Sequence, residues 1–425
     1  MTRIEPVEMA RNAVEAAETP HASAFVTVAR KAFTRFGNNT LTQNLDTETT
    51  SITLSVGDGE RKASIVFEDP GPQSIRAAAE RVREFLKASP PDPEYMPPPP
   101  EGQIYPVIHD SADPEASECP VEKRMEAVKG VIATAAGFGL KAGGICENDW
   151  VRTAVATSIG NLAHHEKTAV NLSFTLDMGE ASSYRNLNHE SWREIPWREA
   201  SEQVAREALS NQGQTEPEAG EYSLILEPLA VTNLLVFLYW SLDARRADEG
   251  LTAFSDMQGK PVSGKGLTLS SDPDGQVKGV PFNPEGLPSR SVVWIREGVL
   301  ENFPCQRFWA ARTRREPLFM PECLQMEGGN GSTRDLVSET GKGILIRRFW
   351  YIRFVDQKTL KLTGMTRDGV FLVENGRVTR PLKDFRWNWR PLELFRSIEA
   401  AGQPVGVSSF LVPPLKIGGI KYPST

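Results

Sequence analysis

Beyond residue 222 the chain consists of short apolar segments separated by glycine-rich turns, and this density of turns constrains the fold more than any other feature. The apolar segments include SLILEP at 223–228, GKGILI at 341–346 and VFLV at 370–373. The clearest turn is Glu374-Asn375-Gly376, because asparagine and glycine tolerate the positive φ of a tight hairpin. Irregular strands of this density are typical of a curved or barrel-like antiparallel sheet. We therefore expect a β-rich, barrel-like domain over residues 222–425, with helices at about 229–243 and 391–400.

The first half of the chain has a different pattern, in which helices alternate with longer strands. Helical patterns fall at 6–18, 73–88, 120–137 and 197–210. Strand patterns fall at 23–36, 50–67, 139–158 and 166–177. Gly57-Asp58-Gly59 should fold the second strand segment back as a hairpin. We expect an α+β domain over residues 1–212, with an antiparallel sheet and long helices, and a boundary in the turn-rich segment 211–221.

A proline-rich segment interrupts the first half at residues 89–102, where the sequence is SPPDPEYMPPPPEG. Proline lacks the N–H that helices and sheet ladders need, so this segment should run as an extended, polyproline-like strap. The sequence does not say whether the strap lies on one domain or joins two.

Charge and composition exclude several classes of partner. The formal net charge of −7 disfavours a nucleic-acid ligand, because phosphate binding normally needs a basic face. No apolar run approaches the roughly 20 residues of a membrane span, so we expect no membrane partner. The amino-terminal residues contain no signal-peptide core, and the four cysteines form no CxxC pair. These features predict a cytoplasmic protein with reduced thiols.

Two segments mix arginine with aromatic residues: RFWAARTRR at 307–315 and RRFWYIRF at 347–354. Such a mixture could stack on single-stranded nucleic acid, or it could form a strand with one buried aromatic face and one arginine face. The acidic chain favours the strand. Exposed aromatic and arginine side chains are also enriched at protein interfaces. We therefore take Arg347 and Trp350 as candidate contacts to a partner or to a substrate groove.

The five histidines lie at 21, 109, 164, 165 and 189, and none follows. His164-His165-Glu166 and His189-Glu190 each begin a zinc-binding helix motif but lack the second histidine one turn later. The first of these also enters a strand pattern, in which neighbouring side chains point to opposite faces. We interpret these histidines as surface or structural residues. Without a histidine nearby in sequence, Cys305 and Cys323 are not expected to act as nucleophiles.

Taken in order, the turn and acidic residues of the second half resemble the C-terminal half of the TldD/PmbA proteins, a family of zinc metallopeptidases that work as paired subunits. The resemblance rests on SLILEPLAVTNLL (223–235), FSDMQGKPVSGKGLTL (254–269), SDPDGQVKGVPFNPEGLPSR (271–290), WIREGVLENF (294–303), GKGILI (341–346) and VENGRVTRP (373–381). It extends into the first half through the order of elements and through AVATSIG at 154–160. It implies an α+β N-terminal domain, which includes the proline-rich strap at 89–102, and a β-rich C-terminal domain.

The resemblance also implies where a zinc ion would be held, and this chain departs from the family there. Catalytic members of the family carry a His-Glu-x-x-x-His helix in the C-terminal half and a cysteine near the chain end. The corresponding helix here is LAVTNLLVFLYW at 229–240, whose polar residues Thr232, Asn233 and Tyr239 are not zinc ligands, and residues 411–425 contain no cysteine. No catalytic residue and no metal ligand transfers, so the isolated chain is not expected to hydrolyse peptide bonds.

The resemblance therefore implies a non-catalytic, TldE- or PmbA-like subunit of a heterodimeric metallopeptidase that cleaves unfolded or leader peptides. Its partner would be a TldD-like subunit that holds the zinc, so no cofactor is expected in this chain. One alternative is a stand-alone homodimer that binds peptides without cutting them. Another is a rewired enzyme that uses Glu147, Asp149, Glu190 or the histidines.

One family segment survives in part at 281–290, PFNPEGLPSR. The family usually has acidic residues where this chain has Asn283 and Pro284, whereas Glu285 and Gly286 are kept. Glu285, with Asn283 beside it, is the candidate contact to a substrate groove. The alternative is a loop whose turn simply requires the glycine.

Overall fold

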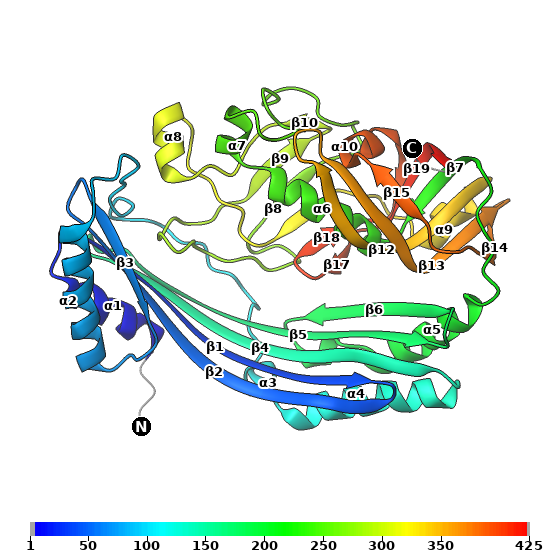
Figure 1. The fold of residues 1–425 in the computed structure, drawn as a ribbon, viewed down its shortest axis with the longest axis horizontal. Helices are drawn as coiled ribbons and strands as arrows, with labels where there is room; N and C mark the ends of the chain where they lie inside the picture. Colours follow the sequence, from blue (N-terminus) through cyan, green and yellow to red (C-terminus); the bar gives the residue numbers. More distant parts are fainter. Residues whose placement is uncertain (1–4, 423–425) are drawn as a thin grey trace.

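A long six-stranded sheet forms the base of the molecule and organises the first half of the chain (Figure 1). The computed structural model describes residues 5–422; residues 1–4 and 423–425, at the ends of the two predicted domains, lie outside the described part. The strand order is β3-β2-β1-β4-β5-β6, and every neighbouring pair is antiparallel. The strands are β1 (His21–Gly37), β2 (Thr40–Gly57), β3 (Lys62–Phe67), β4 (Lys141–Thr157), β5 (Leu162–Asp177) and β6 (Ser182–His189).

Tight turns close the hairpins of this long sheet. Asn38 and Asn39 join β1 to β2 with φ values of 50° and 60°, the left-handed conformation that asparagine tolerates in two-residue hairpins. The predicted hairpin at Gly57-Asp58-Gly59 is confirmed, with β2 ending at Gly57 and β3 beginning at Lys62. Strand β6 was not among the predicted elements.

Four long helices cover the outer face of the long sheet, as Figure 1 shows. Helices α1 (Pro6–Ala17) and α2 (Pro72–Ala88) pack on one end, against alternate residues of β1 and β2 such as Val26 and Leu54. Helices α4 (Val121–Gly137) and α5 (Trp197–Ser210) pack on the other end, against β5 residues such as Leu172. The four helices begin and end within two residues of their predicted bounds. The short helix α3 (Pro114–Ser117) and the 3-10 turn η1 (Trp192–Glu194) lie beside them.

The second half of the chain forms two further sheets around one core. The first sheet has the order β10-β9-β8-β11-β18-β17, and the second has the order β14-β13-β12-β7-β19-β16 with β15 paired to β13. Their bounds are β7 (Gly220–Leu226), β8 (Leu269–Ser271), β9 (Val292–Arg296), β10 (Val299–Leu300), β11 (Leu324–Met326), β12 (Lys342–Asp356), β13 (Lys361–Glu374), β14 (Arg377–Pro381), β15 (Arg386–Trp389), β16 (Ile398–Ala401), β17 (Val405–Val407), β18 (Phe410–Val412) and β19 (Leu415–Tyr422).

Helix α6 (Pro228–Ser241) lies in the core between these two sheets, since its apolar residues share one cluster with β7, β12, β9 and β18. Most pairs in the two sheets are antiparallel, but β7 pairs with β12 and β11 with β18 in parallel. The predicted class is confirmed: an α+β N-terminal part with an antiparallel sheet and long helices, followed by a curved, β-rich C-terminal part. The remaining short helices are α7 (Ala244–Asp248), α8 (Arg307–Thr313), α9 (Thr333–Ser338), α10 (Pro391–Leu394) and the 3-10 turn η2 (Phe395–Ser397).

Two local expectations for the second half are wrong. The predicted helix at 391–400 ends after α10 and η2, because Ile398 instead pairs with Ile417 in the strand pair β16–β19. The segment 307–315, expected as a strand, forms helix α8 and stops where Arg314 takes a left-handed φ of 57°. In both places a tertiary contact or a local turn overrides the spacing of apolar residues.

The proline-rich strap is extended, as predicted, with no helix or strand between α2 and α3. It contacts both halves of the chain. On the long sheet, Asn161 Nδ2 donates to the carbonyls of Pro99 at 2.8 Å and Pro100 at 2.9 Å. On the other side, Arg307 Nη1 donates to the carbonyl of Pro97 at 2.7 Å. The strap therefore bridges the long sheet and the C-terminal half.

Candidate binding sites between the two halves of the chain

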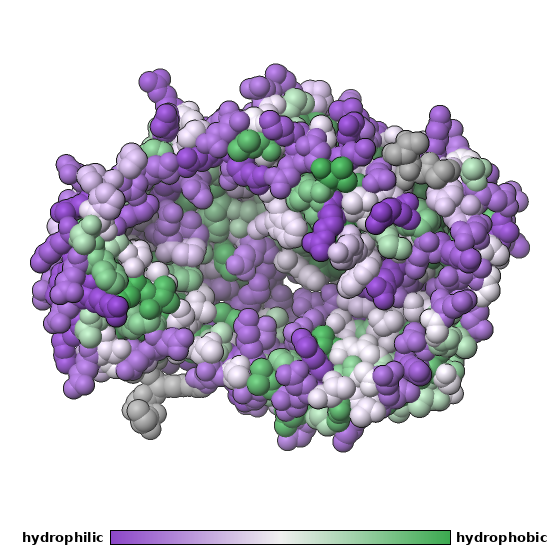
Figure 2. Space-filling model, viewed as in Figure 1, coloured by the Kyte–Doolittle hydropathy of each residue, from purple (hydrophilic) through white to green (hydrophobic). Residues whose placement is uncertain are grey.

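The inner face of the long sheet, which the four helices do not cover, is polar and faces the C-terminal half. Strand registry places residues such as Thr27, Thr53, Thr153 and Asn171 on this face, because the alternate residues of the same strands pack under the helices. The space-filling view shows the surface hollowed between the two halves (Figure 2). Ligand-binding sites are commonly found at such junctions.

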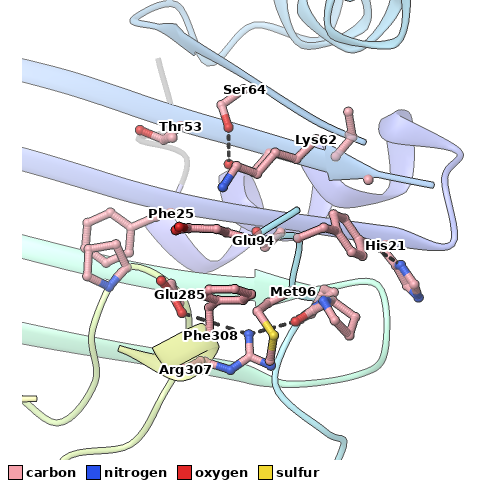
Figure 3. A pocket seen from close by; sticks show the side chains of 18 of the residues that line it. His21, Phe25, Thr53, Lys62, Ser64, Glu94, Met96, Glu285, Arg307 and Phe308 are labelled. Carbon is pink, nitrogen blue, oxygen red and sulfur yellow. Dashed lines mark hydrogen bonds and ion pairs between the residues drawn. The ribbon is translucent and has the colours of Figure 1, made fainter. Parts of the chain in front are cut away.

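A cavity of about 480 Å³ lies at one end of this hollow, and we call it the strap cavity (Figure 3). Its floor comes from β1, β2 and β3, and its walls come from strap residues 94–98 and from C-terminal residues 284–285 and 306–308. Thr53, Lys62 and Ser64 lie on the sheet side, while Glu285 and Arg307 lie opposite. The cavity thus exists only because the sheet, the strap and two C-terminal segments meet.

The charged groups of the strap cavity are paired with opposite charges. Lys62 lies 2.7 Å from Asp92, and this contact lowers the pKa of the Asp92 carboxyl. Glu94 accepts two hydrogen bonds of 3.0 Å from Arg245. Arg307 lies 3.9 Å from Glu285, and burial lowers the pKa of its guanidinium. Because no charge of one sign dominates, the cavity suits a neutral polar ligand better than a multiply charged one.

The two predicted groove residues in this loop have different roles. Asn283 Oδ1 accepts hydrogen bonds from the backbone N–H of Glu285 at 3.1 Å and of Leu287 at 2.9 Å, so it holds its own turn. Gly286 has a φ of +82°, and its carbonyl accepts a hydrogen bond from Tyr105. The turn therefore needs the glycine, while the Glu285 side chain projects at the wall of the strap cavity.

The other two predicted contact residues lie on β12 and do not line the strap cavity. Arg347 pairs with Glu207 of α5 and lies 3.8 Å from Glu227, so it joins the two halves of the chain. Trp350 is 47% exposed and lies beside the guanidinium groups of Arg348 and Arg367, at 5.3 and 4.9 Å. Asn283 and Glu285 therefore lie in the loop beside the strap cavity, whereas Arg347 and Trp350 lie outside this cavity.

Helix α6, where the family resemblance places zinc, does not offer a metal site. Thr232 Oγ1 donates to the carbonyl of Pro228 at 2.9 Å, and Asn233 Oδ1 accepts from the backbone N–H of Phe349 at 3.0 Å. No imidazole, thiolate or carboxylate projects from the helix. Within residues 5–422, no group of three His, Cys, Asp or Glu side chains could hold a metal ion. The residues present do not fit zinc, so no chemical step in this chain can be assigned to it.

The carboxyl end of α6 differs from its sequence-based interpretation. The apolar residues of this helix predict a core element, and Leu234, Leu235 and Leu238 are indeed fully buried. Trp240, however, is 56% exposed and lines a second cavity together with Tyr239. The sequence did not predict the exposure of Trp240, because a helix that is apolar on all sides does not indicate which side faces solvent.

Comparisons with known proteins agree with this architecture. Residues 219–423 match the PmbA/TldA metallopeptidase C-terminal domain. No curated protein sequence matches the chain significantly. Among residues 5–422, no helix is long and apolar enough to cross a membrane.

Three solved structures share the fold of the whole chain at low sequence identity. A proposed modulator of DNA gyrase from Bacteroides thetaiotaomicron has a TM-score of 0.87 and 18% identity, with 99% of both chains covered. A similarly described protein from Thermotoga maritima has a TM-score of 0.84 and 16% identity over 94% of this chain and 95% of its own. TldE from Thermococcus kodakarensis has a TM-score of 0.84 and 17% identity over 97% of this chain and 99% of its own. Both halves of the chain therefore share the fold of these three proteins. With the matching C-terminal domain, the chain belongs to the TldD/PmbA family.

Proposed function

We propose that this chain is the non-catalytic, TldE-like subunit of a heterodimeric metallopeptidase that cleaves unfolded or leader peptides. The observation that carries the proposal is the chemistry of α6. Its polar side chains carry hydroxyl, amide, phenol and indole groups, and Thr232 and Asn233 are hydrogen-bonded within the protein. A family member with this helix needs a partner chain to supply a metal and the hydrolytic chemistry.

The polar hollow between the two halves supports a role in holding a peptide. Hydroxyl and amide side chains on the inner face, and paired charges in the strap cavity, match a peptide main chain, which carries both donors and acceptors. In this proposal the chain contributes walls and positioning contacts, and the zinc is in the partner subunit.

The test is co-expression with the zinc-bearing relative encoded in the same genome, followed by size-exclusion chromatography and digestion of an unfolded protein and of a leader peptide. We expect a heterodimer whose proteolysis is lost when this chain is omitted. A partner with its zinc-binding histidines replaced serves as a control, and it should form the same complex without activity. Unchanged proteolysis by the partner alone would contradict the proposal. A homodimer that ignores the partner would instead favour the stand-alone peptide-binding protein.

A further inference from the structure

The second cavity, of about 440 Å³, lies where the carboxyl end of α6 meets β5 of the long sheet. We call it the α6 pocket. Its apolar wall is formed by α6 and by strands β11 and β18, and two charged side chains, Lys167 and Glu322, also line it. The apolar wall residues are Val236, Tyr239, Trp240, Leu324 and Phe410.

The aromatic wall of the α6 pocket is held in place by neighbouring rings. Trp240 packs edge-to-face on Phe237 with ring centroids 5.2 Å apart, and Tyr239 packs in the same way on Phe410 at 6.3 Å. Phe237 and Phe410 are themselves buried, so the two wall rings rest on the core. Trp240 nevertheless leaves 56% of its surface exposed. A supported aromatic ring with this much open surface is a pre-formed contact for another apolar group.

Polar groups at the α6 pocket remain available to a ligand. Neither the Tyr239 hydroxyl nor the Trp240 indole N–H makes a hydrogen bond to another described residue. Burial raises the pKa of Tyr239, so its hydroxyl stays protonated and can donate. Lys167 and Glu322 lie 4.0 Å apart, with 26% and 65% of their side chains exposed, so this ion pair is long and open to water.

We propose that the α6 pocket binds one large apolar or aromatic side chain of an extended peptide segment. Its volume lies toward the lower end of the ligand-site range of about 300–1,000 Å³, which suits a side chain rather than a docked helix or domain. Lys167 and Glu322 present one positive and one negative group, which complement the carbonyl and amide groups of a main chain. A peptide as the ligand rests on the proposed function.

The α6 pocket is a binding site in this proposal and not a catalytic site. The thiol in its wall, Cys323 Sγ, lies 3.3 Å from the carbonyl of Asp272 as a hydrogen-bond donor. Burial raises the pKa of Cys323 to about 12, so the thiolate needed for attack is absent at neutral pH.

The test uses the purified full chain alone and isothermal titration with two blocked pentapeptides, one with a central phenylalanine between alanines and one with alanine throughout. Burial of the phenyl ring should strengthen binding roughly tenfold or more. Trp240→Ala should bring the affinity for the phenylalanine peptide close to that of the alanine peptide. Phe85→Ala is the matched control, because Phe85 is also an exposed aromatic residue (42%) but lies on α2, outside the α6 pocket.

A second variant separates the polar contact from the apolar one. Tyr239→Phe keeps the ring and removes the hydroxyl, so it should weaken both peptides by a similar factor and preserve the preference for phenylalanine. The inference is overturned if wild-type protein binds both peptides equally. It is also overturned if Phe85→Ala weakens binding as much as Trp240→Ala, or if Trp240→Ala changes the oligomeric state but not peptide affinity.

The outcome is independent of the test of the proposed function. If the α6 pocket shows no preference but paired proteolysis still requires this chain, only the pocket assignment fails. If the preference is found but the partner cleaves peptides unaided, the subunit role fails and the chain is a peptide-binding protein.

Discussion

His165 shows how one side chain on the long sheet is set by its surroundings. It is opposite Thr153 on the inner face, and its Nε2 is buried without a hydrogen-bond partner among the described residues. Burial, together with Lys167 and His164, lowers the pKa of His165 to about 4. The sequence predicted a surface or structural histidine, but it could not show that the ring would lack a partner, because the facing groups come from other elements.

We expect His165 to weaken the fold in acid. The native state holds the imidazole neutral, whereas the unfolded chain takes up a proton near pH 6.5. Above pH 6.5 His165 therefore does not reduce the free energy of unfolding. As the pH falls from 6.5 to about 4, protonation of the unfolded chain lowers this free energy. Urea unfolding at pH 7 and pH 4.5 should show His165→Gln losing about 2 kcal/mol less stability than wild type.

His164→Gln is the control for this measurement, because His164 is the exposed neighbour on the opposite face of β5. It should lose as much stability as wild type over the same range. Equal pH dependence of wild type and His165→Gln would show that His165 is not the responsible group.

The packing of α4 on α5 illustrates the element scale. The apolar spacing of both helices was readable in the sequence, and both are confirmed. Gly130 lies in the middle of α4, and from the sequence alone it is expected only to weaken the helix. In the structure a Cβ on Gly130 would lie 2.0 Å from a ring carbon of Trp197, so the glycine is what lets the indole of α5 lie against α4.

Gly130→Ala should therefore destabilise the protein although alanine is the better helix former. The steric clash costs about 1–3 kcal/mol, and the gain in helix propensity offsets up to about 1 kcal/mol of it. Thermal and urea unfolding should show a net loss. Gly137→Ala, at the end of the same helix, meets nothing within 4 Å and should be neutral or slightly stabilising. Equal effects of the two substitutions would contradict the close-packing argument.

At the scale of the whole molecule, a few polar contacts tie the long sheet to the C-terminal half. Ser182 Oγ donates to Asp368 at 2.6 Å, and Asp368 also forms an ion pair with Arg348. Both charged side chains are nearly buried, with 2% of Asp368 and 11% of Arg348 exposed. Removing one partner of a buried pair leaves the other charge uncompensated, which is more costly than losing an exposed pair.

Asp368→Asn should therefore loosen the junction between the two halves. The amide retains a hydrogen-bond acceptor for Ser182 but leaves Arg348 without this counter-ion, and we expect a loss of about 3–5 kcal/mol. Limited trypsin digestion should also cut faster near Arg348 and between the two halves of the chain. Glu218→Gln makes the same chemical change in the exposed pair with Arg380 and should cost less than about 1 kcal/mol. Similar losses in both variants would contradict a buried junction.

The sequence by itself determined the four long helices of the first half and most of its strands, where periodicity extends over many residues, but not the first part of β2, residues 40–49. It also determined the α+β class and the absence of zinc-ligating residues from α6. These are local properties, carried by residue type and spacing. It was less informative where elements are short: the segment 391–400 and α8 were misread, and β6 was missed.

Only the tertiary structure decided which distant surfaces meet. The strap cavity joins β1–β3 to residues 284–285 and 306–308, and the α6 pocket joins α6 to β5 and β18. The exposure of Trp240, the buried Nε2 of His165 and the contact of Gly130 with Trp197 all depend on such meetings. The local sequence around a residue does not specify these contacts, because the contacting atoms belong to segments that lie tens to hundreds of positions away in the chain.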